Sequence, residues 1–237
     1  MNSIRNSRPI PLALTMLVAL FSALVALAVA GGHDAAAQGN DDGHATASAV
    51  AADGAVVTPR IVGFHDEMRR LWEEHVTWTR LAIISLVGGT PDTDASVARL
   101  LQNQTDIGDA IKPFYGDAAG EELTRLLREH ILIAADIIAA AKAGDQAALV
   151  GAQSRWTANA DEIAAFLAAA NPRAWDLDEM ESMLQEHLRL TTDEAVARLQ
   201  SNWDADVVAY DEIHRQALGM ADMLSDGIIK QFPARFR

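Results

Sequence analysis

Three glutamate-histidine pairs stand in this chain at nearly constant spacing. The three histidines are separated by 55 and 57 residues, and similar apolar and charged residues surround each pair. The pairs are Glu74-His75, Glu129-His130 and Glu186-His187. Imidazole and carboxylate groups bind zinc, iron, manganese or copper(II), so these residues are candidate metal ligands. Repetition at a fixed period also indicates repeated structural units.

Apolar residues beyond Ile61 recur every three or four positions, which is the helical period, and strand-like alternation is absent. Turn residues such as Ala143-Gly144-Asp145 divide this region, with a glycine where a left-handed helix end is wanted. The pattern predicts six helices, over residues 64–87, 93–112, 119–142, 146–169, 178–199 and 203–231. Short connections make neighbouring helices antiparallel, so we expect an all-α up-down bundle built as three repeated antiparallel hairpins.

The three paired histidines are predicted to face the core of this bundle. His75 shares its apolar stripe with Leu71 and Ile83, and the other two histidines lie on equivalent stripes. The glutamate before each histidine is displaced by about 100°, toward the edge of the stripe. The intervening helices also carry polar residues on their apolar faces, namely Asn103, Asn159 and His214. The sequence therefore predicts one shared polar layer near mid-helix.

The leading hypothesis is that this layer binds a divalent transition metal: zinc, iron, manganese or copper. The candidate ligands are His75, His130, His187, His214, Glu74, Glu129 and Glu186, and the residues expected to shape the site are Asn103, Asn159, Asp106 and Asp211. The glutamates are equally candidates for orienting the imidazoles rather than binding the ion. Three imidazoles with an open fourth position would match a zinc hydrolase in ligand number alone.

Two other functions stay open. The chain is alternatively a non-catalytic binding or interaction module whose buried polar layer fixes the helix register. A metal-dependent hydrolase or oxidase is the weaker alternative, because the sequence shows no nucleophile. Whether the protein is an enzyme, and in which oligomeric state it works, is left open by the sequence.

Composition excludes several other kinds of site. The chain has 33 acidic residues against 19 lysines and arginines, a formal net charge of −14, which argues against a nucleic-acid partner. It contains no phosphate-binding loop or dinucleotide fingerprint, so a nucleotide partner has no support. It also contains no cysteine, so disulfides and thiolate metal sites are absent.

The N-terminus has the order of an export signal. Basic residues, an uncharged apolar run and small residues follow one another over residues 1–37. Residues 38–60 are expected to form a flexible spacer, and residues 61–237 the helical bundle domain. We therefore expect an exported protein of the periplasm, cell envelope or extracellular space, which would contact a membrane only if the apolar run stays uncleaved.

Four stretches resemble an uncharacterised family of exported bacterial all-helical proteins. They are Leu101–Gly116, Leu127–Ala135, Trp156–Leu167 and Asp226–Phe232, and the resemblance covers nearly all of the chain after residue 64. Some members carry a glycosyltransferase label, which these residues do not support. The resemblance implies the same helix boundaries and the importance of the Glu-His and Asn positions, but it implies no reaction.

Overall fold

The fold is all-helical, as predicted. The computed structural model describes residues 57–237, and every regular element within that range is a helix. The elements are α2 (Pro59–Gly88), α3 (Thr93–Tyr115), α4 (Asp117–Ala143), α5 (Gln146–Ala170), α6 (Leu177–Leu199), α7 (Trp203–Gln231) and a short 3-10 helix η1 (Pro233–Arg235). The expected export signal, residues 1–37, lies outside the described residues, as does the expected spacer up to residue 56.

Helix ends follow local chemistry at most boundaries. Gly144 ends α4 in the left-handed conformation, with φ 69° and ψ 20°, which confirms the expected glycine cap. Asp176 caps α6 by accepting hydrogen bonds from the backbone N–H groups of Asp178 and Glu179. The helix α2 begins at Pro59, earlier than predicted, because proline is well suited to the first turn of a helix.

The helix α3 differs from the prediction at its C-terminus. The predicted helix ended at residue 112, directly before Pro113, yet α3 continues through this proline to Tyr115. The helix then ends at Gly116, whose N–H donates to the carbonyl oxygen of Lys112 and whose φ is 85°. Proline removes one backbone donor without forbidding a final turn, and the left-handed glycine supplies the true end.

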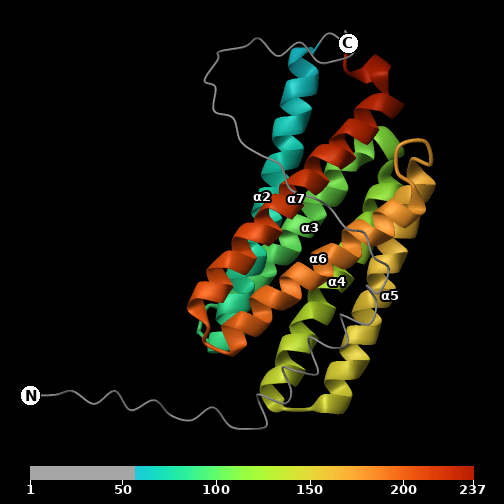
Figure 1. The fold of residues 1–237 in the computed structure, drawn as a ribbon. Coiled ribbons are helices and arrows are strands. Elements are labelled where there is room, and N and C mark those ends of the chain that lie inside the picture. Colours follow the sequence, from blue (N-terminus) through green and yellow to red (C-terminus); the bar gives the residue numbers. More distant parts are fainter. Residues whose placement is uncertain (1–56) are drawn as a thin grey trace, which may run out of the picture. The chain divides into compact units, whose positions relative to one another are not determined.

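The six helices pack as one helical bundle. The helix α3 packs on α4, α4 on α5, α5 on α6, and α6 on α7. Figure 1 shows α2 beside α7, where Arg69 forms an ion pair with Asp222. The helix α2 also meets α3, because the side chain of Asn103 donates to the carbonyl oxygen of Leu71. Consecutive helices therefore lie together, and the first is joined to the last.

The helices α3 and α4 approach closely at two glycines. A Cβ atom on Gly108 would lie 2.0 Å from Thr124 Oγ1 and 2.5 Å from the carbonyl oxygen of Gly120. A Cβ atom on Gly120 would lie 2.6 Å from the carbonyl oxygen of Gly108. Only glycine allows the two backbones this contact, so the crossing point is fixed by these two residues.

A buried ion-pair network joins α2, α6 and α7. Arg80 Nη1 lies 2.8 Å from Glu194 Oε1 and 3.1 Å from Asp206 Oδ1. Arg198 Nη1 lies 3.0 Å from Asp206 Oδ2. The side chains of Glu194 and Asp206 are 1% and 2% exposed, so both carboxylates depend on these arginines for compensation.

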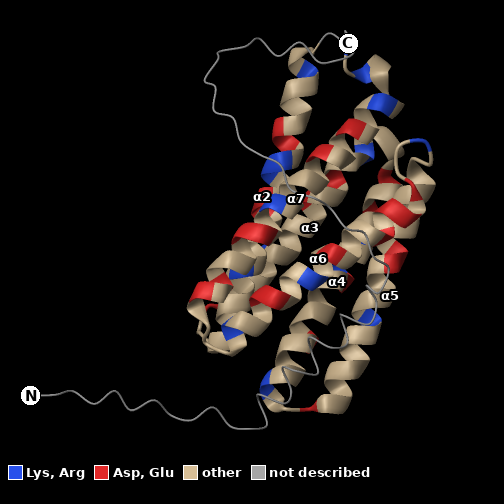
Figure 2. Ribbon diagram, in the orientation of Figure 1, with Lys and Arg blue, Asp and Glu red and all other residues tan. Residues whose placement is uncertain are grey.

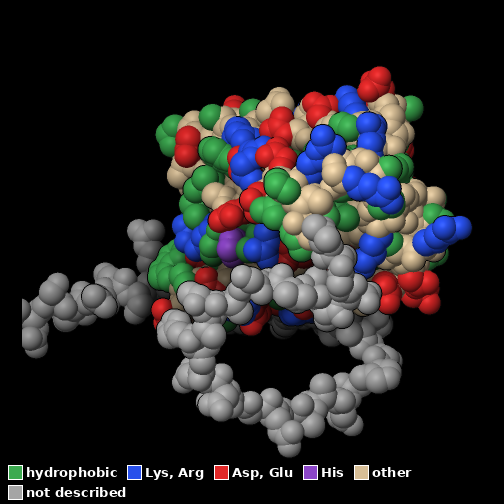
Figure 3. All heavy atoms as spheres, turned by 90° about the horizontal axis from the view of Figure 1, so that it is seen from above, with side chains coloured by type: hydrophobic (Ala, Val, Ile, Leu, Met, Phe, Trp, Pro, Cys, Tyr) green, Lys and Arg blue, Asp and Glu red, His purple; other side chains and the backbone are tan. Residues whose placement is uncertain are grey.

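Charges of both signs are mixed on the surface. Figure 2 shows Lys, Arg, Asp and Glu on all six helices, and the face in Figure 3 has basic and acidic side chains next to one another. Many are paired along one helix, such as Arg125 with Glu122 and Glu129. None of the helices within residues 57–237 is long and apolar enough to span a bilayer.

Candidate functional site

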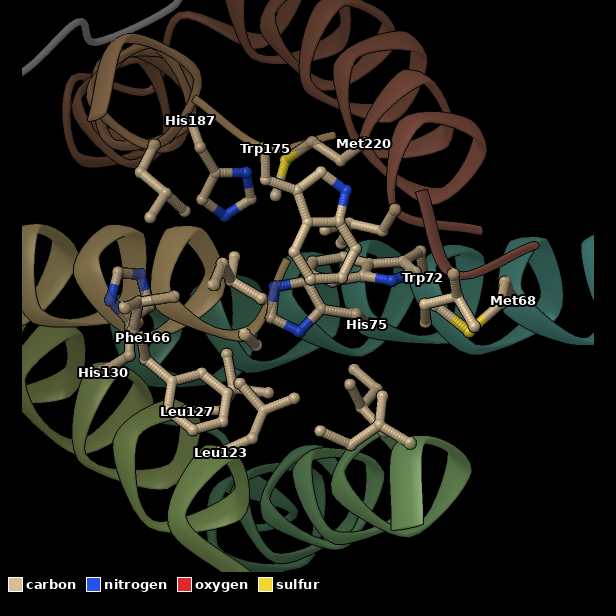
Figure 4. Close-up of a pocket in the computed structure, with 18 of the residues that line it drawn as sticks. Met68, Trp72, His75, Leu123, Leu127, His130, Phe166, Trp175, His187 and Met220 are labelled. Atoms are coloured by element: carbon tan, nitrogen blue, oxygen red, sulfur yellow. The ribbon is translucent and has the colours of Figure 1, made fainter. Parts of the chain in front are cut away.

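The three paired histidines come together in the core of the bundle. His75 of α2, His130 of α4 and His187 of α6 are 3%, 5% and 5% exposed. The ring centroid of His187 lies 5.7 Å from that of His75 and 6.2 Å from that of His130. Figure 4 shows the three rings around one space. We call these three residues the histidine layer.

Each imidazole of the layer contacts a carboxamide 29 residues further along the chain. His130 Nδ1 lies 2.9 Å from Asn159 Oδ1, and His187 Nδ1 lies 3.1 Å from Gln216 Oε1. His75 Nδ1 lies 3.2 Å from Gln104 Nε2. The three contacts join α2 to α3, α4 to α5, and α6 to α7.

The amide orientation fixes the tautomer of two histidines. Asn159 Nδ2 donates to the carbonyl oxygen of Leu126 at 3.1 Å, and Gln216 Nε2 donates to that of Met183 at 3.1 Å. With their nitrogens turned to the backbone, both amides present an oxygen to the imidazole. His130 and His187 therefore carry hydrogen on Nδ1, and their Nε2 atoms carry the lone pair.

His75 is held differently. At the other two histidines one amide contacts both the ring and the backbone carbonyl, but at His75 two residues share these contacts. Asn103 donates to the carbonyl oxygen of Leu71, four residues before the histidine, and Gln104 contacts the ring. Gln104 Nε2 faces His75 Nδ1, the carbonyl oxygen of Leu100 at 2.8 Å and Asn103 Oδ1 at 3.1 Å. This amide has three acceptors for two hydrogens. His75 accepts at Nδ1 and keeps its hydrogen on Nε2, so its contact is the weakest of the three.

The layer is electrically neutral. Burial, reinforced by the neighbouring imidazole of His187, lowers the pKa of His75 and of His130 to about 3. Burial also lowers the pKa of His187. Neutral imidazole is the form that binds metal ions, and it can also accept a hydrogen bond. Within residues 57–237, no hydrogen bond reaches the Nε2 atom of any of the three rings.

A cavity of about 40 Å³ lies against the layer. Its wall is mainly apolar and includes all three histidines together with Trp72, Trp175 and Met220. This volume has room for about two or three water molecules, or for an ion with a water. Figure 4 shows the indoles of Trp72 and Trp175 on the same side of the layer as Met220.

Indole donors add polar character to the surroundings of the layer. The Nε1 atoms of Trp72, Trp156 and Trp175 are buried without a hydrogen-bond partner in the described part of the chain. The Trp72 ring packs edge-on against His75 with centroids 5.5 Å apart, and Trp156 packs against His130 at 5.1 Å. Buried polar atoms without partners are uncommon, so their concentration here marks the region as more than apolar packing.

The paired glutamates lie outside the histidine layer. Each forms ion pairs with arginines instead: Glu74 with Arg70 and Arg99, Glu129 with Arg125, and Glu186 with Arg189. Their side chains are 28%, 48% and 47% exposed. The three carboxylates therefore contact arginines, and none of them contacts an imidazole of the histidine layer.

Of the remaining predicted site residues, two asparagines lie beside the histidine layer and the others lie away from it. Asn159 contacts His130, and Asn103 donates to the carbonyl oxygen of Leu71, one turn before His75. His214 faces Glu73 at 3.7 Å with its side chain 30% exposed. Asp106 contacts Gln102 and Arg99, and Asp211 is exposed. Within residues 57–237, no group of three or more His, Asp or Glu is placed to hold a metal ion as it stands.

The sequence analysis did not include two supporting residues, Gln104 and Gln216, among the predicted site residues. The signal that identifies the glutamines is the separation of 29 residues from a histidine, which occurs three times. Comparison with known proteins adds nothing to this geometry, because no family model, no curated protein and no solved structure matches the chain.

Proposed function

We propose that this protein binds a divalent transition metal ion through the Nε2 atoms of His75, His130 and His187. The observation that carries the proposal is the carboxamide against each Nδ1 atom. In metal sites the ring nitrogen that does not bind the ion is almost always hydrogen-bonded, which fixes the ring and leaves the other nitrogen for the metal. Two of the three rings already have this tautomer.

The ligand set narrows the choice of metal. With the carboxylates turned to arginines at the surface, the candidate ligands are three neutral imidazoles. Imidazole suits zinc, copper, iron and nickel, whereas manganese prefers oxygen ligands. Zinc and copper(II) are therefore favoured over manganese within the expected group.

Binding requires the rings to move closer together. Two imidazoles on one tetrahedral zinc ion have ring centroids about 5 Å apart, given a Zn–N distance of about 2.0–2.1 Å. The centroid distances of 5.7 and 6.2 Å exceed this by about 1 Å. His75 must also move its hydrogen from Nε2 to Nδ1. Side-chain rotation of this size is compatible with the cavity beside the layer.

We further propose that the domain consists of three copies of one antiparallel hairpin arranged up and down, each contributing one histidine. The contacts that support this are the three histidine-carboxamide separations of 29 residues. The amide-to-carbonyl separations of 32, 33 and 33 residues agree with it. We also propose that the protein functions outside the cytoplasm, on the basis of the export signal expected at residues 1–37.

Metal analysis tests the function directly. The full chain, purified without chelator, is expected to contain about one metal ion per molecule, or to gain thermal stability with added zinc or copper(II). Saturation at 100 times the dissociation constant stabilises by about 2.7 kcal/mol. His130→Gln should abolish the gain, and the surface variant His214→Gln should keep it. Absence of both bound metal and a thermal shift contradicts the proposal.

The second candidate is a non-catalytic interaction module in which the layer only fixes helix register. The aromatic packing of Trp72 and Trp156 on the imidazoles and the apolar cavity wall favour it. A double variant, His130→Leu with Asn159→Leu, removes the polar pair and distinguishes the two functions. Under the structural role, stability is unchanged or raised and no bound ion is lost.

The structure supports a hydrolase function less well than either of the two functions above. Ser225 Oγ lies 2.7 Å from His65 Nδ1, and His65 Nε2 lies 3.3 Å from Asp226 Oδ1, so a serine, a histidine and an aspartate are in contact. However, Ser225 is 0% exposed and its hydroxyl donates to the carbonyl oxygen of Ala221 at 2.7 Å. A nucleophile must reach its substrate, and this hydroxyl is enclosed within its helix interface.

A further inference from the structure

Four of the five methionines within residues 57–237 line one groove. The groove has a volume of about 640 Å³ and lies between α6 and α7, which run side by side in Figure 1. Met180 and Met183 come from α6, and Met220 and Met223 come from α7. Each pair is three residues apart, so both members lie on the same helix face.

The methionines form a floor and a rim. Met180 and Met220 are 1% and 3% exposed, whereas Met183 and Met223 are partly exposed. Methionine used only to fill gaps in a core would be buried throughout. Here Met183 and Met223 remain partly accessible to solvent, and they line the same groove as the two buried methionines. Gly219, also in the groove, has no atom within 4 Å of the position a Cβ would take, which keeps the groove open.

Carboxylates surround the thioethers. Asp178, Glu179 and Glu186 line the same groove, and no lysine or arginine does. Glu186 is paired with Arg189, but Asp178 and Glu179 lie in the first turn of α6 without an ion pair in the described residues. Negative side chains at the mouth of a groove raise the local concentration of cations.

We propose that this groove binds a soft monovalent cation, copper(I), through the thioether sulfurs of Met180, Met183, Met220 and Met223. Thioether sulfur is a soft, neutral ligand that selects copper(I) over zinc, magnesium or calcium. Silver(I) has the same charge and softness and serves as an air-stable probe. The acidic rim attracts the ion, and the sulfurs retain it.

The groove adjoins the histidine layer but uses other ligands. Met220 lines both the groove and the cavity beside the layer, and Figure 4 shows its sulfur on the side of His187. Gln216 lines the groove while its amide oxygen contacts His187 Nδ1. The copper(I) site goes beyond the divalent-metal site proposed above, and either can exist without the other.

Methyl resonances of methionine report the ligands one by one. In full-length protein labelled with [methyl-¹³C]methionine, stoichiometric silver(I) should shift the resonances of Met180, Met183, Met220 and Met223. Met68 is the internal control, because it is buried in the core on α2 and lies outside the groove. The proposal is overturned if the groove resonances do not move, or if Met68 moves as much as they do.

Competition with a copper(I) chelator, bicinchoninate, gives the affinity. The variant carrying Met183→Leu and Met223→Leu keeps side-chain volume at two partly exposed positions, so the fold should persist. We expect its copper(I) affinity to fall by at least about tenfold, and the control Met68→Leu to bind as the wild type does. Equal affinities in all three proteins overturn the proposal. The thermal shift with zinc reports the histidine layer separately, and should be the same in both variants.

Discussion

His130 and Asn159 form the hydrogen bond on which the interpretation of the core depends. Their Nδ1 and Oδ1 atoms are 2.9 Å apart, and Asn159 Nδ2 donates in turn to the carbonyl oxygen of Leu126. One carboxamide therefore satisfies a buried ring donor and a buried backbone acceptor at once. The same bridge occurs between His187, Gln216 and Met183, which makes it a property of the bundle rather than of one site.

Asn159→Leu should destabilise the protein by about 1–3 kcal/mol, because it leaves the Nδ1–H of His130 buried without a partner. If the layer binds a metal, its affinity should also fall by about 10–100-fold. Urea unfolding measures the first effect and a zinc titration the second. Gln102→Leu, at an exposed position on α3, is the control and should change stability by less than about 0.5 kcal/mol. Wild-type stability in Asn159→Leu would contradict the assigned bridge.

Stability should fall as the pH is lowered from about 6.5 toward 3. The pKa of His75 and of His130 is about 3 in the folded protein and near 6.5 when unfolded, so the unfolded chain takes up protons first. Each contributes a loss of about 1.4 kcal/mol per pH unit in this window. Glu194, whose pKa burial raises to about 7, acts in the opposite direction between about 4.5 and 7. Its single proton is outnumbered by those of the histidines.

Urea unfolding between pH 4.5 and 7.5 measures this slope. His130→Gln should make the dependence shallower, whereas His214→Gln, at a partly exposed site on the surface, should leave it unchanged. A stability that stays constant or rises on acidification would show that the layer is protonated in the folded state.

Gly227→Ala should destabilise the protein by about 1–3 kcal/mol through overpacking. The new Cβ would lie 2.2 Å from Trp175 Nε1 and 2.7 Å from Trp175 Cε2, so the indole beside the cavity would have to move. Gly219→Ala lies on the same helix with no atom within 4 Å and should stabilise instead, by up to about 1 kcal/mol. Thermal unfolding followed by tryptophan fluorescence compares the two; equal effects would refute the packing argument.

Arg80→Ala should cost about 3–5 kcal/mol, because it leaves the carboxylate of Glu194 buried without its ion-pair partner and removes one of the two arginines at Asp206. Arg125→Ala removes a surface arginine that also contacts two glutamates, and should cost much less stability than Arg80→Ala. Chemical unfolding of both variants at pH 7.5 shows whether the loss of stability depends on the burial of the ion pairs or on their number. A similar cost for the two would mean that the Arg80 network is solvated.

Helical periodicity was enough to predict the all-helical class and the burial of the three paired histidines. Glu129 and Glu186 pair with arginines of their own helices, at spacings that the sequence contains. Glu74 also pairs with Arg99 on α3, and no periodic pattern within one helix contains that contact. The α7 residue beside His187 was also misassigned, because the sequence analysis chose His214 and the structure has Gln216 there. His214 and Gln216 are two positions apart, or about 200° around the helix, so only one of them can face the layer.

The contacts between α2 and α3 show a second limit of sequence reasoning. Asn103 bonds to the carbonyl of Leu71 across 32 residues, while its counterparts Asn159 and Gln216 span 33. One residue fewer turns the helix by about 100°, so Gln104 rather than Asn103 meets Nδ1 of His75. Aligned motifs do not reveal this change, because it depends on how α3 is rotated against α2.

The depth of the histidine layer has a consequence for exchange kinetics. With the rings 3–5% exposed, an ion or small molecule has little direct access to them from solvent. Wider access requires helices to separate locally, and such openings are much rarer than side-chain motions. If an ion binds in the layer, we therefore expect it to exchange slowly, at a rate limited by the opening of the bundle as well as by the strength of its bonds to the histidines.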